Sequence, residues 1–135
     1  MSRSEPDAMR HRIAFITIGQ APRDDVAPEI LGMIERQVLC DQYGALDDVS
    51  AEEIARHAPA PGDESLYTRL ANGTHVVISS SFVEGHLEET VRRVDEARYD
   101  LIAIITTGVF RPFGARTPLI NGQRVVDAWI ESLVM

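Results

Sequence analysis

Residues 13–25 read Ile13-Ala14-Phe15-Ile16-Thr17-Ile18-Gly19-Gln20-Ala21-Pro22-Arg23-Asp24-Asp25. The first six are apolar or β-branched, which predicts a buried strand over residues 13–18. The strand runs directly into a turn that is crowded with polar donors. In an open α/β sheet, ligands bind in the crevice beyond the carboxyl ends of the strands. Gly19, Gln20 and Arg23 are therefore candidate ligand-binding residues, for something small and negatively charged.

A second turn of this kind follows the apolar run of residues 101–105. It reads Thr106-Thr107-Gly108 and would present hydroxyls and backbone N–H groups at the same edge of the sheet. Ser80, which follows another predicted strand, is a further candidate. The site hypothesis requires the Arg23 guanidinium and the Thr107 hydroxyl to share one pocket.

The rest of the chain alternates strand and helix patterns. Further strands are predicted at residues 38–43, 66–70, 75–79 and 101–105, with a short extended piece at residues 118–120. The Asn72-Gly73 dipeptide predicts a β-hairpin between the second and third of these. The alternation predicts a three-layer α/β sandwich with a mostly parallel sheet of about four to five strands, helices on both faces and one β-hairpin.

Four helices are predicted, each with a start signal or an apolar stripe. Asp24 or Asp25 would cap a helix that starts at residue 26. Ser50 and Glu53 form a capping box for a short helix that ends by residue 59. A long amphipathic helix is predicted over residues 82–98, with Ser81 as its cap, and a last helix over residues 125–134.

The composition of the chain limits the classes of protein to which it can belong. The chain has 135 residues, 44% of them hydrophobic and 25% charged, which fits one domain over residues 13–135 after a flexible polar extension at residues 1–12. The net charge of −8 argues against nucleic acid and anionic membranes as partners. No apolar run approaches the ~20 residues of a membrane helix, and residues 1–12 lack the pattern of a secretory signal. A cytoplasmic location is expected, and the single cysteine agrees with it.

All 13 basic residues are arginine, because the sequence contains no lysine. This excludes a Schiff-base lysine, and with it pyridoxal-phosphate enzymes, as well as the P-loop. No GxGxxG fingerprint or GxSxG elbow occurs, so no cofactor is predicted. The histidines lack the spacing of a metal site, so no metal is predicted either; they are His11, His57, His75 and His86.

Each candidate also has a plain structural interpretation. Arg23 could form a surface ion pair, and Gly19 with Gln20 could be an ordinary turn. Cys40 is interpreted as a structural cysteine on the strand at residues 38–43. The Asp47-Asp48 pair, which precedes a capped helix, is interpreted mainly as a solvated feature that complements the helix dipole.

Three segments together resemble the AroM family of the aspartate/glutamate racemase-like superfamily. They are residues 17–26; residues 44–50 with Glu53-Ile54; and Thr107-Gly108-Val109-Phe110. They occur in the order found in the family, and the similarity spans most of residues 13–134. The resemblance implies a pocket for an amino acid or a small dicarboxylate.

This chain departs from the family pattern in two ways. Family members are longer, with two similar lobes facing each other across a cleft, and this chain resembles the N-terminal lobe. In racemases of the superfamily, one cysteine from each lobe acts as acid or base on the substrate. Here Thr106 occupies the cysteine position, and a hydroxyl cannot replace a thiolate as a base.

Three hypotheses follow. In the first, the chain binds a carboxylate-bearing metabolite through residues 19–24 and 106–108. In the second, it is a cofactor-independent isomerase, racemase-like enzyme or lyase that needs a second lobe or a homodimer. In the third, it is a non-catalytic interaction module or a truncated remnant, and it carries an apolar patch at the carboxyl edge of the sheet.

Overall fold

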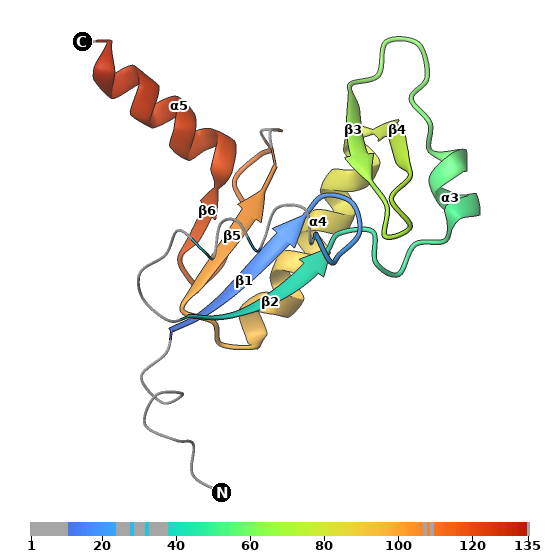
Figure 1. Cartoon of the computed structure of the whole chain (residues 1–135). Coiled ribbons are helices and arrows are strands. Elements are labelled where there is room, and N and C mark those ends of the chain that lie inside the picture. The colour runs from blue at the N-terminus through green and yellow to red at the C-terminus, as the bar shows by residue number, and fades with distance from the viewer. Residues whose placement is uncertain are drawn as a thin grey trace, which may run out of the picture.

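The computed structural model describes residues 11–23, 28, 32, 38–106, 108 and 110–134. Four strands form one parallel sheet in the order β2-β1-β5-β6, and two further strands form a separate antiparallel hairpin (Figure 1). The sheet strands are β1 (His11–Thr17), β2 (Val38–Gly44), β5 (Leu101–Ile105) and β6 (Leu119–Asn121). The α/β class, the mostly parallel sheet and the separate hairpin predicted from the sequence are confirmed.

β1 is a central strand of the sheet. It pairs in parallel with β2 on one side and with β5 on the other, so that Phe15 lies opposite Gln42 and Ala103. Its side chains alternate between the two faces, as in any strand. Ala14 and Ile16 are fully buried in the core. The observed strand begins two residues before the predicted start and ends at Thr17.

The helix α4 (Ser80–Glu96) covers one face of this sheet (Figure 1). Its buried side chains recur at helical spacing and pack with Ile16, Ile102 and Ile104 of the sheet; they are Val83, Leu87, Val91 and Val94. The prediction that Ser81 caps this helix is wrong. The helix begins at Ser80 with Ser79 as its N-cap residue, because β4 runs into it without a loop.

The strands β3 (Ser65–Arg69) and β4 (His75–Ser79) pair antiparallel, as the Asn72-Gly73 dipeptide predicted. Gly73 has a φ of +88°, a conformation that glycine adopts without the Cβ penalty. Alternation places Tyr67 and Arg69 on one face of the hairpin, and Leu66 and Thr68 on the other. The hairpin stands at the end of the sheet where β1 and β5 finish (Figure 1).

Two shorter helices complete the described structure. The helix α3 (Ala51–Arg56) begins after Ser50, whose side chain accepts a hydrogen bond from the Glu53 N–H at 3.1 Å, as the capping motif predicted. The helix α5 (Gly122–Leu133) begins after Asn121, whose side chain accepts from two backbone N–H groups. Of the helix expected from residue 26, the structure describes only Pro28 and Gly32, both of which are helical; its expected caps, Asp24 and Asp25, lie outside the described residues.

α5 projects from the body of the protein (Figure 1). It contacts β5 and β6, and none of its residues is buried. Its apolar side chains form an exposed row that includes Val126, Trp129, Ile130 and Leu133, with Trp129 64% exposed. Within the part of the chain that the structure describes, no helix is both long and apolar enough to cross a lipid bilayer.

Candidate functional site

The turn that follows β1 is fixed by main-chain hydrogen bonds to two other segments. The Gln20 N–H donates to the Arg69 carbonyl at the end of β3, at 3.1 Å. The Leu46 N–H donates to the Gly19 carbonyl, and the Ala45 N–H donates to the Thr17 carbonyl, each at 2.9 Å. The carboxyl ends of β1, β2 and β3 are therefore joined at one point.

Gly19 allows this close approach. A Cβ at this position would lie 2.2 Å from the Arg69 carbonyl oxygen and 2.5 Å from the Thr68 hydroxyl. Neither neighbour is the free end of a long side chain, since one is backbone and Thr68 is buried. The sequence suggested that Gly19 lets a ligand approach the backbone, whereas in the structure the approaching group is the hairpin.

The side chain of Gln20 completes the same junction. Its amide nitrogen donates to the carbonyls of Leu46 at 3.0 Å and Val49 at 3.4 Å, and its amide oxygen accepts from the Ala71 N–H at 2.9 Å. All of these partners are backbone groups of the protein. Gln20 therefore holds together the segments that surround the site, and it does not line the cavity described below.

Asp47 also acts within this junction. Its two carboxylate oxygens accept hydrogen bonds from the N–H groups of Ala21 and Gly44, each at 2.8 Å. The carboxylate thus ties the turn after β1 to the end of β2. Asp48 is different, because its side chain is 87% exposed and lies 3.8 Å from Arg93.

Arg23 lies just beyond this junction, after a cis peptide bond between Ala21 and Pro22. Its backbone N–H donates to the Gln42 side-chain oxygen at 2.7 Å, which fixes the main chain of Arg23 beside β2. The residue is half-buried and lines a cavity at the carboxyl edge of the sheet. Thr106, at the end of β5, lines the same cavity.

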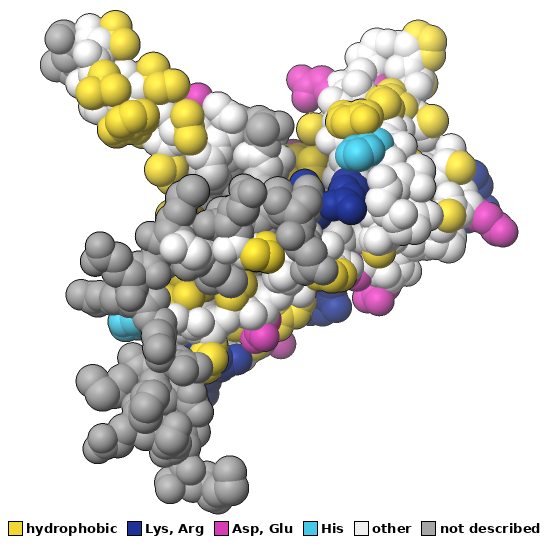
Figure 2. Space-filling view, in the orientation of Figure 1, with side chains coloured by type: hydrophobic (Ala, Val, Ile, Leu, Met, Phe, Trp, Pro, Cys, Tyr) yellow, Lys and Arg dark blue, Asp and Glu magenta, His cyan; other side chains and the backbone are white. Residues whose placement is uncertain are grey.

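The cavity has a volume of about 720 Å³. It lies between the sheet, the hairpin and the first turns of α5, and Figure 2 shows a hollow between the projecting α5 and the hairpin. Its floor is apolar and comes from alternate residues of two neighbouring strands: Ile13, Phe15, Leu101, Ala103 and Ile105. These residues belong to the face of the sheet opposite α4, since the residues between them pack against that helix.

The hairpin supplies lining residues that the sequence did not single out. Tyr67, Arg69 and His75 share the hairpin face that borders the cavity. The rings of Tyr67 and His75 stack with centroids 5.0 Å apart and planes 2° from parallel. None of these residues belongs to a recognisable motif. The alternation of the strand predicts only that Tyr67 and Arg69 share a face, not what that face borders.

The described residues that line the cavity have a net charge opposite in sign to that of the whole chain. Among the described lining residues are two arginines, Arg23 and Arg69, and no aspartate or glutamate. The chain as a whole has a net charge of −8. A cavity in which the described charged side chains are both guanidinium groups favours an anionic ligand over a cation.

Of the other predicted site residues, Thr106 lines the cavity, whereas Ser80 and Gly108 do not. The Thr106 hydroxyl accepts a hydrogen bond from the Gly108 N–H at 2.9 Å, so its own hydrogen can be donated to another group. Ser80 is the first residue of α4, and its N–H donates to the Glu64 carbonyl. Thr107 lies outside the described residues.

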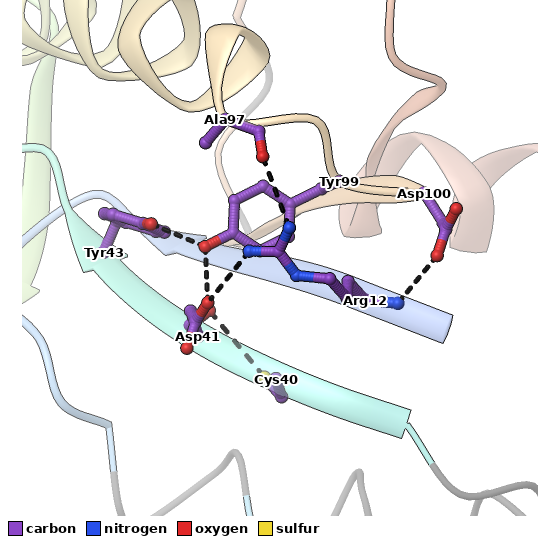
Figure 3. Close-up of polar contacts among 7 residues, drawn as sticks. All are labelled: Arg12, Cys40, Asp41, Tyr43, Ala97, Tyr99 and Asp100. Carbon is purple, nitrogen blue, oxygen red and sulfur yellow. Dashed lines mark hydrogen bonds and ion pairs between the residues drawn. The ribbon is translucent and has the colours of Figure 1, made fainter. Parts of the chain in front are cut away.

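Cys40 lies on β2, in the region of Figure 3, and is not among the described residues that line the cavity. Burial and, secondarily, the neighbouring Asp41 carboxylate raise the pKa of its thiol above the ordinary value. A raised pKa disfavours the thiolate, which is the nucleophilic form. The structural interpretation of Cys40 is therefore the better one.

A polar network that the sequence analysis missed joins β2 to the start of β5 (Figure 3). The Tyr99 hydroxyl donates to the Asp41 carboxylate at 2.5 Å, and the Tyr43 hydroxyl lies 2.6 Å from the Tyr99 hydroxyl. Since Tyr99 has one proton, Tyr43 is the donor to Tyr99. The Arg12 guanidinium lies over the Tyr99 ring, 4.6 Å from its centroid. These contacts tie β2 to the segment that precedes β5.

The model of one protein family, described as AroM protein, matches residues 13–135. No curated protein and no solved structure matches the chain. The match includes all three segments on which the resemblance was based. Parts of two of these segments, residues 17–20 and 44–49, meet in the hydrogen-bonded junction beside the cavity.

Proposed function

This chain belongs to the AroM family, and we propose that it binds a small carboxylate-bearing metabolite at the carboxyl edge of its sheet. The observation that carries the proposal is the cavity lined by Arg23, Arg69 and Thr106. A guanidinium can pair with both oxygens of a carboxylate, and a hydroxyl can donate to one of them. The position beyond the ends of β1 and β5 is where α/β sheets bind ligands.

Rigid support for Arg23 strengthens the proposal. The turn before it is held by main-chain bonds to two other segments, the end of β3 and the residues after β2, and its own N–H is held by Gln42. A binding residue whose surroundings are already ordered loses less entropy when the ligand arrives. The cluster formed by Gln20 and Asp47 is in this view the support of the site rather than the site itself.

Thermal unfolding with a panel of carboxylates tests this proposal. A ligand that binds only the folded state at 100 times its Kd stabilises that state by about 2.7 kcal/mol, which raises the melting temperature by several degrees. The panel contains aspartate, glutamate, succinate and longer monocarboxylates. Arg23→Gln should abolish the shift.

The matched control is Arg92→Gln, which alters an exposed arginine on α4 that pairs with Glu89. This variant should respond to the ligand like the unaltered protein. If no carboxylate in the panel raises the melting temperature, the binding proposal is wrong.

The proposal is one of binding rather than catalysis. A racemase-like isomerase or a lyase would need a group that can remove a proton from carbon. Thr106 stands at the position of the family cysteine, and the Cys40 thiol has a raised pKa. Incubation of the protein with amino acids in deuterium oxide would detect the isomerase activity as deuterium at the α-carbon, and its detection would overturn this choice.

We also propose that a second copy of this chain packs against α5. The observation that favours it is the exposed apolar row on this helix, which includes Trp129 and Leu133 at 64% and 65% exposure. Beside this row lie Asp127 and Glu131, and the hairpin wall of the cavity has Arg69 and His75. The acidic flank of α5 in one copy therefore complements the basic wall of another.

Sedimentation velocity over a range of protein concentrations tests this second proposal. The unaltered protein should form dimers, and Trp129→Gln should shift the equilibrium towards monomers. Arg92→Gln is the control, because Arg92 is exposed on α4 and belongs neither to α5 nor to the hairpin wall of the cavity. A monomer at every concentration would contradict the proposal.

A further inference from the structure

The dimensions of the cavity bear on the class of its ligand. Its volume of about 720 Å³ falls well inside the range of pockets that hold drug-sized molecules, about 300–1,000 Å³. Aspartate and succinate are much smaller than such molecules. A ligand that occupies the whole cavity therefore has a substantial body in addition to a carboxylate.

The polar and apolar groups of the cavity are separated along the strands. Arg23 and Thr106 follow the carboxyl ends of β1 and β5. The floor runs back from there to Ile13 and Leu101, which are paired in the register of these two strands. From that pair to the pair Thr17–Ile105 there are four residue steps, about 13 Å at a rise of about 3.3 Å per residue.

Among the described lining residues, none at the far end of the floor has a side chain that can bind a second carboxylate. Across the sheet, the row at its centre is Phe15, Ala103 and Ile120, which are neighbours in register on β1, β5 and β6. A carboxylate laid on such a surface would lose its hydration without gaining a hydrogen bond, which is costly. An alkyl or ring system laid there is stabilised instead, because it removes from water the exposed part of this row, which belongs more to Ile120 (41% exposed) than to Phe15 (6% exposed).

From this separation we infer that the ligand is a monocarboxylate with an elongated apolar body, bound with its carboxylate at the end of the cavity that holds Arg23 and Arg69 and with its body along the sheet floor. The inference rests on the proposed function and names the ligand class of the same site. It replaces the expectation of a small dicarboxylate that the family resemblance suggested. Ala103 has the smallest side chain in the floor, so it leaves the most space for the body of the ligand.

Calorimetric titration of the unaltered protein with carboxylates of increasing acyl-chain length tests the inference. The probes are butyrate, hexanoate, octanoate and decanoate, compared with succinate, glutamate and uncharged decanamide. Each buried methylene should tighten binding by about threefold to fourfold. Decanoate should bind at least tenfold more tightly than decanamide, and succinate more weakly than hexanoate.

Two variants locate the body of the ligand. Ala103→Met fills the floor and should weaken decanoate at least tenfold while leaving butyrate within twofold. Ala128→Met, on α5 and outside the cavity lining, is the matched control and should leave both probes unchanged. Circular dichroism confirms that each variant is folded, and the chain-length series does not depend on either.

The outcomes separate the two proposals. If succinate or glutamate binds as tightly as decanoate and Arg23→Gln weakens both, the proposed function stands and the inferred ligand class is wrong. If affinity does not rise with chain length, the inferred class is wrong as well. If no carboxylate binds at all, the proposed function itself fails.

Discussion

The side-chain amide of Gln20 donates to the Leu46 carbonyl at 3.0 Å, across 26 positions of sequence. This bond joins the turn after β1 to the segment that leads into α3. Together with the bonds from Gln20 to Val49 and Ala71, it makes one side chain the shared partner of two segments, the one that leads into α3 and the turn of the hairpin. The polar turn that suggested a ligand is thus largely occupied by the protein's own backbone.

Gln20→Glu should destabilise the fold by about 2–3 kcal/mol. The change keeps the shape of the side chain but removes the two N–H donors that face the carbonyls of Leu46 and Val49. Chemical denaturation at neutral pH measures the loss. Gln42→Glu is the control, because a carboxylate there can still accept from the Arg23 N–H; it should cost less than about 1 kcal/mol. Equal losses in the two variants would contradict this account of Gln20.

Gly19→Ala should destabilise the protein by more than about 2 kcal/mol, because the new methyl group collides with the Arg69 carbonyl and forces the hairpin to move. The same substitution at Gly85, on the exposed surface of α4 with open space around it, should stabilise by up to about 1 kcal/mol. Thermal unfolding of the two variants should therefore shift in opposite directions. A Gly19→Ala variant as stable as the unaltered protein would refute the close approach.

Tyr99 should make the stability fall in alkaline solution. Its pKa lies well above the usual range, owing to burial first and then to its hydrogen bond with Asp41. The stabilisation is complete below the tyrosine pKa of the unfolded chain, about 10, and is lost as the pH rises from there towards the folded pKa. The free energy of unfolding should therefore decrease between pH 9 and 11, and less steeply in Tyr99→Phe.

Tyr67→Phe is the control for this pH series, since Tyr67 is 68% exposed and its removal should leave the slope unchanged. At pH 7, Tyr99→Phe should also cost about 1–2 kcal/mol because Asp41 and Tyr43 lose their shared partner. Identical slopes for all three proteins would show that Tyr99 is not responsible for the alkaline loss.

Asp95 should contribute stability that is lost in acid. Its carboxylate accepts hydrogen bonds from the N–H groups of Arg116 and Thr117, at 3.0 and 2.9 Å, and these bonds lower its pKa, the Arg116 bond most. Its stabilisation is present above the ordinary Asp pKa, about 3.9, and disappears as the pH falls through the lower folded value. Urea midpoints between pH 6 and pH 2.5 should fall less in Asp95→Asn than in the exposed control Asp48→Asn.

Local sequence patterns predicted the elements of the fold well. The apolar run at residues 101–105 and the Asn72-Gly73 turn each predicted the element that the structure contains. Ser81 was misassigned as a helix cap because β4 passes into α4 without a loop, and nothing in the serine run distinguishes its three members. The periodicity that marks a strand or a helix is a local property of the sequence. The residue at which β4 ends and α4 begins is decided by tertiary packing instead.

The candidate site was predictable only in part, for a related reason. Arg23 and Thr106 follow strands, and the parallel topology brings strand ends together, so their common cavity follows from the topology. Arg69 and His75 reach the same cavity through the docking of the hairpin over the sheet edge, a tertiary contact without a local signal. Gln20 was assigned to the ligand because the sequence does not reveal which polar groups the backbone itself will use.

The central position of β1 has a consequence for how the chain acquires its structure. The Arg12 N–H donates to Asp100 across 88 positions, and β1 has β5 as one of its two neighbours. During synthesis, one side of this apolar strand stays without its partner until residues 101–105 have left the ribosome. Such distant pairings slow folding and leave the unpaired edge of the strand open to association with other chains until β5 docks.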